Sequence, residues 1–244
     1  MPKPRKFVFL SDTHGDQADV GAVAAAKEFC RHFKPEVRIH GGDAFDLRCL
    51  RRGAGSEEVL EDLKADIDAG LDFLRWMRPT HYLRGNHCER LTDAINSHNP
   101  LLRRFACLTW EEVLHAIKGA QIFPYCKARG ILQIGSLKFA HGFASGVYAA
   151  KRMAEVYGSV VFGHVHVSEA FSIPGLEPRV GRAAGCLCKL SMDYNRAQLN
   201  TLRQRHGFAY GFLHHDGTHE VYLASPINGV WRFPTEFREI RHAS

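Results

Sequence analysis

Short apolar runs that end in polar turn residues predict the first strands of this chain. The run at 6–10 leads into SDTHGD, and the alternating run at 36–40 leads into GGD. Two later runs, 80–83 and the apolar part of SVVFGHVH, open into RGNH and GHVH. Runs of this length and composition, bounded by Gly, Asn or Asp, are typical of buried strands.

Apolar residues spaced by three and four predict helices between these strands. The clearest pattern lies at 57–78, with Ser56 and two glutamates at its start and Pro79 just past its end. An acidic first turn suits the positive end of a helix dipole, and proline cannot continue a helix. Weaker patterns predict helices at 19–33, 91–105, 110–118 and 146–157.

The last third of the chain changes to mostly strand-like segments. ILQIGSLKFAHG (131–142) predicts a hairpin that turns at Gly135–Ser136. After residue 166 come EAFSI, RVGRAA, AAGCLCKL, FAYGFLHH and HEVYLAS, all strand-like. We therefore predict an α/β fold in one domain over 1–244. Its part at 6–166 carries the candidate site, and 167–240 completes a second sheet.

Polar residues that can carry chemistry gather just past the ends of these strands. Asp12 and His14 follow FVFLS, Asp43 follows VRIHGG, Asn86 and His87 follow HYLRG, His141 follows LKFA, and His164 and His166 follow VVFG. Each of these motifs is common by itself. Because sites in α/β sheets assemble at the carboxyl ends of the strands, we expect the five loops to converge.

The residue types suit a metal centre that needs no sulfur. Carboxylate oxygens, imidazole nitrogens and an amide carbonyl fit manganese, iron or zinc. The candidates are too many for one ion, and one shared carboxylate would bring two ions close together. Such a pair acidifies a water and holds phosphate oxygens, which favours hydrolysis. Glycines beside the candidates, at 15, 41, 42, 85, 142 and 163, would let the backbone turn tightly around the ions.

The ordered set DTH, GGD, GNH, HG and GHVH resembles the calcineurin-like metallophosphoesterase family over residues 6–166. The resemblance implies a four-layer αββα sandwich of two mixed β-sheets flanked by helices. It also implies two divalent metal ions, manganese first, with iron, zinc, nickel or cobalt as alternatives. The implied ligands are Asp12, His14 and His166 for the first ion, Asp43 for both, and Asn86, His141 and His164 for the second. His87 is implied as the general acid, while a hydroxide that bridges the ions attacks the phosphorus.

The chain departs from the family pattern directly after GNH. The family usually has an acidic residue there, whereas this chain has Cys88 followed by Glu89. Either Glu89 orients His87, or the pKa of His87 is set in another way. Asp46, in GDAFD, matches a recurring aspartate of the family; we expect it to position a ligand or an arginine, with an ordinary turn cap as the alternative.

Other motifs bear on the kind of phosphoester. GDAFDLR lacks the DRG of protein Ser/Thr phosphatases, and GHVH resembles the broader phosphodiesterase and nuclease branches. Arg84 and Arg90 are candidates for contact with phosphate. In RCLRRG, Arg48 and the two arginines at 51 and 52 would track a phosphate backbone if this segment lines the cleft; a solvated loop is the alternative.

The net charge of +6 favours an anionic partner, although a solvated basic surface explains it almost as well. We expect a phosphodiesterase that acts on nucleic acid or nucleotides, with a DNA nuclease among the candidates and DNA or RNA as the expected substrate. A phosphomonoesterase of nucleotides, sugars or proteins is the alternative. A catalytically silent binding protein is a third hypothesis, which the intact ligand set disfavours. The sequence does not indicate an oligomeric state.

Cysteine usage and hydropathy bear on location. Seven cysteines at irregular spacing are typical of free thiols in a reducing compartment, and CLC (186–188) lacks a second pair to complete a structural zinc site. No run approaches the roughly 20 apolar residues of a membrane helix. FVFL is too short for the core of a signal peptide. We therefore expect a cytoplasmic protein that does not bind membranes.

Overall fold

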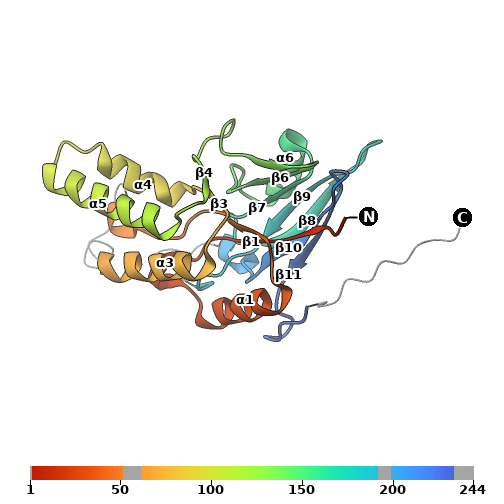
Figure 1. Cartoon of the computed structure of the whole chain (residues 1–244), viewed down its shortest axis with the longest axis horizontal. Helices are drawn as coiled ribbons and strands as arrows, with labels where there is room; N and C mark the ends of the chain where they lie inside the picture. The colour runs from red at the N-terminus through yellow and green to blue at the C-terminus, as the bar shows by residue number, and fades with distance from the viewer. Residues whose placement is uncertain (1, 52–61, 192–198, 234–244) are drawn as a thin grey trace, which may run out of the picture.

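The computed structural model describes residues 2–51, 62–191 and 199–233. Two β-sheets pack face to face, and helices cover their outer faces (Figure 1). This arrangement confirms the expected sandwich of two mixed sheets flanked by helices. In the described part of the chain, no helix has both the length and the apolar character of a membrane span.

The first sheet has six strands in the order β11-β10-β1-β2-β3-β4. Their bounds are β1 (Arg5–Leu10), β2 (Val37–His40), β3 (His81–Leu83), β4 (Gln121–Phe123), β10 (Phe208–Leu213) and β11 (His219–Ala224). Strands β1 to β4 are parallel neighbours, so their carboxyl ends lie at one edge of the sheet. β10 and β11 extend the sheet in antiparallel register.

The second sheet has five strands in the order β5-β6-β7-β9-β8. Their bounds are β5 (Leu132–Ile134), β6 (Leu137–Ala140), β7 (Val160–Phe162), β8 (Ser168–Ile173) and β9 (Arg179–Ala184). The predicted hairpin is β5–β6. Because β6 and β7 are parallel, with Ala140 opposite Phe162, the HG and GHVH loops that follow them leave the sheet side by side.

We expected from the sequence that the β-rich tail would complete the second sheet. This expectation is only partly correct. β8 and β9 join that sheet, but β10 and β11 join the first one. The reason is packing, since Phe208 and Tyr210 of β10 lie against Phe29 on the outer face of the first sheet. The segment AAGCLCKL is also not one strand, because β9 ends at Ala184 and Gly185 follows with a φ of 82°.

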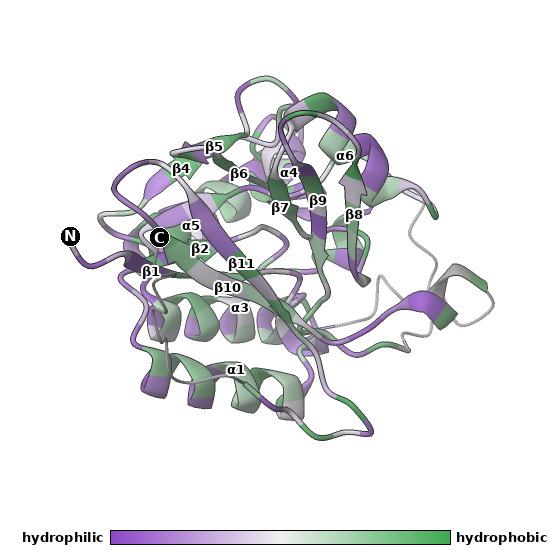
Figure 2. Cartoon of the chain, turned by 90° about the vertical axis from the view of Figure 1, so that its right-hand side faces the viewer, coloured by the Kyte–Doolittle hydropathy of each residue, from purple (hydrophilic) through white to green (hydrophobic). Residues whose placement is uncertain are grey.

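Five α-helices are described: α1 (Val20–Phe33), α3 (Leu63–Met77), α4 (Asn86–Ile95), α5 (Pro100–Ala116) and α6 (Ala149–Tyr157). Three short 3-10 turns, η1 (Gly15–Gln17), η2 (Arg48–Leu50) and η4 (Leu199–Arg203), complete the order. Helices α1 and α3 lie side by side below the first sheet, with mixed apolar and polar colouring (Figure 2). Apolar faces of both pack on β1 and β10, while α6 covers the second sheet.

Two helix boundaries differ from the predicted ones. The helix expected at 57–78 begins at Leu63 in the described residues, because Asp62 caps it by accepting from the amides of Lys64 and Ala65; residues 57–61 lie outside the description. The helices expected at 91–105 and 110–118 are instead α4 and α5. The break falls at Asn99, whose side chain accepts from two amides just ahead, with proline at the first helical position.

Phenylalanines fill the space between the two sheets. Phe7 and Phe9 of β1 face Phe139 of β6, with ring centroids 5.2 and 6.1 Å apart. All three are fully buried, together with Ile39 and Val161. Burial of aromatic side chains on both inner faces holds the sheets together, so the loops at their ends keep a fixed spacing.

Candidate metal centre

The five polar loops meet at the edge where β1, β2, β3, β6 and β7 end. Seven candidate ligands predicted from the sequence lie within contact of one another there: Asp12, His14, Asp43, Asn86, His141, His164 and His166. Asp12 and Asp43 are fully or almost fully buried. The convergence expected from the motif order is therefore present in the fold.

The candidates form two groups of facing atoms. In the first group, His166 Nε2 lies 3.2 Å from His14 Nε2 and 3.3 Å from an oxygen of Asp12. In the second, the side-chain oxygen of Asn86 lies 3.0 Å from His141 Nε2 and 2.8 Å from His164 Nδ1.

Asp43 lies between the two groups. One of its oxygens is 3.1 Å from His141 Nε2. Its ligand atoms also cluster with those of His164 on one side and with those of His14 and His87 on the other. Asp43 therefore has the position that a carboxylate shared by two ions would need.

Charge inside the site is balanced among the buried side chains. Burial disfavours the imidazolium of His141, but the neighbouring Asp43 carboxylate outweighs this and raises the pKa of His141 to about 9. Burial would raise the pKa of Asp12, but hydrogen bonding to His166 reverses the shift and lowers it. For His164, burial and then the nearby His141 lower the pKa to about 4. The carboxylates are thus held ionised, which is the form that binds metal.

The backbone is strained at most of the candidate ligands. Asp12, His14, Asp43, His164 and His166 all have φ between 51° and 69°. This left-handed region costs about 1–3 kcal/mol for a residue other than glycine, and such strain gathers at functional sites. The strain turns each side chain inward directly after its strand.

Two of the predicted glycines are required by close approach. A Cβ atom on Gly85 would lie 2.0 Å from an oxygen of Asp43, and one on Gly163 would lie 2.3 Å from an oxygen of Asp12. Both distances are far below contact, so any side chain there would displace a carboxylate. Glycine thus lets the backbone pass beside the two buried aspartates.

Asp46 orients His87. The Nδ1 atom of His87 lies 2.7 Å from the carbonyl oxygen of Asp46 and 2.8 Å from its carboxylate. The same carboxylate lies 3.1 Å from Nδ1 of His14. Since both partners of His87 Nδ1 are acceptors, that nitrogen carries a proton and Nε2 is left to face the site. Asp46 thus contacts a candidate ligand, His14, and the candidate acid, His87.

Neither residue after the GNH histidine orients His87. Cys88 is buried in the core around α3, α4 and α5, with its sulfur 3.4 Å from the hydroxyl of Tyr82. Glu89 turns to Arg84, 3.1 Å away. Both point away because α4 begins at Asn86, and successive helical residues are rotated by about 100°. The residue that contacts His87 Nδ1 is Asp46, which comes from another loop.

The predicted arginines have different surroundings. Arg84 bonds Thr92 and lies over the ring of Trp110, so it anchors α4 to α5 and does not face the site. Arg48 is buried in a double contact with Asp16, at 2.6 and 2.8 Å, which contradicts a role along a phosphate backbone. Arg90 remains near the site, 3.5 Å from His87 Nε2. Residue 52 lies outside the described ranges.

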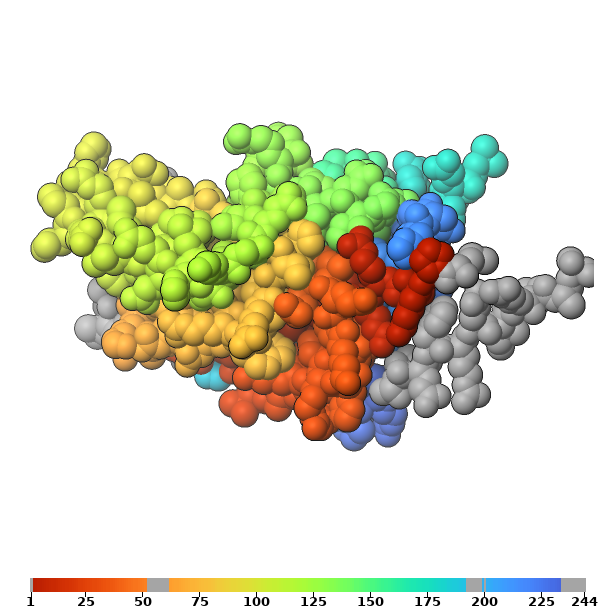
Figure 3. All heavy atoms as spheres, viewed as in Figure 1, coloured from red at the N-terminus to blue at the C-terminus, as the bar shows by residue number. Residues whose placement is uncertain are grey.

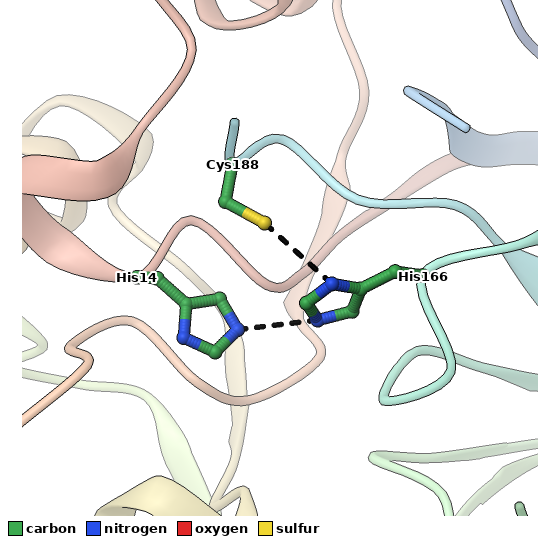
Figure 4. A group of neighbouring side chains, drawn as sticks. All are labelled: His14, His166 and Cys188. Atoms are coloured by element: carbon green, nitrogen blue, oxygen red, sulfur yellow. Dashed lines mark hydrogen bonds between the residues drawn. The ribbon is translucent and has the colours of Figure 1, made fainter. Parts of the chain in front are cut away.

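Two residues near the centre have no counterpart in the sequence prediction. Cys188 lies behind His166, with its sulfur 3.7 Å from Nδ1, so His166 sits between Cys188 and His14 (Figure 4). Asp66 of α3 accepts from the amides of Asp46 and Leu47, at 2.9 and 2.6 Å. Asp66 had a detectable signal, an acid on the apolar stripe of its helix. Cys188 belongs to CLC, which the sequence marked only as an incomplete zinc pair; the short segment after β9, which ends at Ala184, brings it beside His166.

We predict that Cys88→Glu destabilises the fold. The nearby Arg84 is already paired with Glu89, so burying a further carboxylate beside Tyr82 should cost about 3–5 kcal/mol of unfolding free energy, measured by urea denaturation. Cys107→Glu, in the half-buried wall of α5, is the matched control and should cost much less. Equal losses in the two variants would contradict the buried position of Cys88.

The chain is similar to known proteins in sequence and in fold. A family model described as calcineurin-like phosphoesterase matches residues 5–168. No curated protein matches the chain. Among solved structures, vacuolar protein sorting 29 from Cryptosporidium parvum is similar at a TM-score of 0.48 and 12% identity, covering 95% of this chain and 96% of that one. The phosphoesterase Yfce from E. coli is similar at a TM-score of 0.41 and 14% identity, covering 86% and 89%.

The family match spans about two thirds of the chain, from β1 to the first residue of β8, and includes every loop of the candidate centre. The chain therefore belongs to the calcineurin-like phosphoesterase family, a family of metal-dependent phosphoesterases.

Proposed function

We propose that this protein hydrolyses phosphodiesters of nucleic acid or nucleotides with two divalent metal ions. The observation that carries the proposal is the pair of facing ligand groups joined at Asp43, with His87 at their edge. Asp12, His14 and His166 would hold one ion, Asn86, His141 and His164 the other, and Asp43 both. Bound ions would activate the attacking water and neutralise charge on the phosphate.

The donor set fits such ions. It combines carboxylate and amide oxygens with imidazole nitrogens, and within the described residues Asp12 and Asp43 form their ion pairs with histidines. Oxygen ligands suit manganese, and imidazole ligands suit iron, zinc and nickel. We propose manganese first, with iron, zinc, nickel and cobalt as alternatives. Cys188 contacts the far nitrogen of His166, where it would orient a ligand without replacing one.

His87 would act as the general acid. In the imidazolium form, the Nδ1–H is held by Asp46, which fixes the ring, and the Nε2–H can pass to the leaving oxygen. Nε2 lies 4.0 Å from an oxygen of Asp43, so it would face a phosphate bound at the mouth of the centre. After donation, the ring keeps its proton on Nδ1.

Two features would hold the phosphate. The guanidinium of Arg90 donates to the carbonyl of Asp46 at 2.6 Å and places its other arm beside His87 Nε2. Helix α4 begins at Asn86, so its positive end faces the centre, and the His87 amide already donates to Asp43 at 2.9 Å. An anionic phosphate would be stabilised by both.

An aromatic wall beside the centre favours substrates with a flat group. The ring of Tyr125 lies 5.7 Å from that of His141 and stacks on Phe143 at 5.1 Å. A nucleobase would pack against this wall, and this is our reason for preferring nucleotide or nucleic-acid diesters to simple phosphomonoesters.

All seven cysteines are free thiols, which supports a reducing, cytoplasmic setting.

We expect Asp43→Ala to abolish hydrolysis and metal binding while the fold persists. Removing Asp43 takes away the one carboxylate common to both groups. The metal content measured by elemental analysis, up to two transition-metal ions per chain in the parent, should therefore be lost. Asp72→Ala, an exposed aspartate on α3, is the matched control and should keep both properties. Full activity in the Asp43 variant would refute the shared role.

We expect His87→Gln to lower kcat by about 10²–10⁴ on substrates with poor leaving groups. The loss should be much smaller on bis-(p-nitrophenyl) phosphate, because nitrophenolate leaves without a proton. Steady-state kinetics on this diester and on a dinucleotide measure the difference. Equal losses on both would show that His87 does not protonate the leaving group.

The substrate class is tested by a panel with Mn²⁺. We expect cleavage of bis-(p-nitrophenyl) phosphate and of at least one among single-stranded DNA, double-stranded DNA and a cyclic nucleotide. Hydrolysis of p-nitrophenyl phosphate alone would instead favour a phosphomonoesterase. No hydrolysis of any member by the metal-loaded protein would favour a silent binding protein.

A further inference from the structure

A basic groove lies on the side of the molecule away from the metal centre. It consists of two adjoining hollows that share Arg38, Arg75 and Arg78, the larger of about 900 Å³. The C-terminal ends of α1, α3 and α5 line it, and the colours of these segments adjoin on the face seen in Figure 3. We call it the helix-end groove.

The helix-end groove is separate from the metal centre because the two lie at opposite ends of β2. Arg38 is the second residue of that strand, whereas Asp43 follows its carboxyl end. Likewise, Pro79 and Thr80 precede β3, whereas Asn86 and His87 follow it. None of the groove residues belongs to the candidate ligand set.

The groove accounts for the basic character of the chain. Its lining holds seven cationic side chains and one acidic side chain, Glu28. The cations are Lys27, Arg31, Lys34, Arg38, Arg75, Arg78 and Lys118. This excess of six equals the formal net charge of +6 for the whole sequence, so the remaining charged residues balance.

Helix capping explains only part of this charge. Lys34 and Arg78 are the C-cap residues of α1 and α3, and Arg38 donates to the Arg78 carbonyl at 2.8 Å. Each helix end carries about half a negative charge, so three ends offset only about 1.5 of the excess. Pairing of Arg75 with Asp72 offsets one more. The groove keeps a positive field.

The chemistry of the lining points to one kind of partner. Cations spread along a groove match the evenly spaced charges of a phosphodiester backbone. A lipid surface would require large apolar side chains exposed beside the cations, and none of the described lining residues is among the exposed large hydrophobics. We propose that the helix-end groove binds the backbone of a nucleic-acid strand.

The test compares two triple variants with equal loss of charge. Lys34→Asn, Arg78→Asn and Lys118→Gln together lower the excess of positive charge in the groove from six to three. Asparagine suits the left-handed backbone at the first two positions. Arg103→Gln, Arg104→Gln and Arg152→Gln are the matched control on exposed helix faces outside the groove. Binding of a fluorescein-labelled single-stranded oligonucleotide is measured by anisotropy in EDTA, over a series of salt concentrations. Thermal melting followed by circular dichroism checks the fold of both.

We expect the groove variant to bind about tenfold more weakly, with a salt dependence of log K shallower by about 2, as for three lost contacts to a single strand. The control should bind within about twofold of the parent. Equal loss in both variants, or no loss in either, overturns the proposal. The parent is also mixed with phosphatidylserine vesicles. If the parent does not bind the oligonucleotide, the proposal is overturned, whether or not it binds the vesicles. Because EDTA excludes catalysis, these results are independent of the proposed phosphodiesterase activity.

Discussion

The buried carboxylate of Asp43 is the contact on which the rest of the centre depends. A carboxylate in the protein interior is costly unless charged or polar partners surround it. Here His141 and the amide of His87 supply those partners from two different loops. Asp43 follows β2 in the first sheet and His141 follows β6 in the second. The contact between them therefore also links the two sheets.

The loops around Asp43 have a strained backbone, and the packed sheets hold that backbone in place. Left-handed backbone at five candidate ligands would not persist in an isolated loop. The loops are anchored at strands whose phenylalanines fill the interface, and amides of neighbouring loops bond across them, as Asp12 and His14 do with Gly42 and Asp43. The stability of the core thus maintains an unfavourable but functional geometry.

Support for His87 comes from a residue far away in the chain and not from its neighbour in sequence. The helix begins at Asn86, so the residue after His87 points into the core and suits a small apolar thiol better than an acid. Asp46 supplies the acceptor from across the site, and Asp66 holds the backbone of Asp46 in turn. Burial raises the pKa of Asp66 to about 6, the cost of placing this second carboxylate under the loop.

The sequence by itself determined the α/β class, most strands and the loops that carry the candidate ligands, because hydrophobic periodicity and strand-end polar residues are local signals. It did not determine that β10 and β11 extend the first sheet, since strand partners depend on which aromatic faces meet in space. Nor did it show that Arg48 is paired with Asp16, that Asp46 orients His87, or that scattered cations form one groove. These depend on distances between residues far apart in the chain, which only the packed sheets and helices decide.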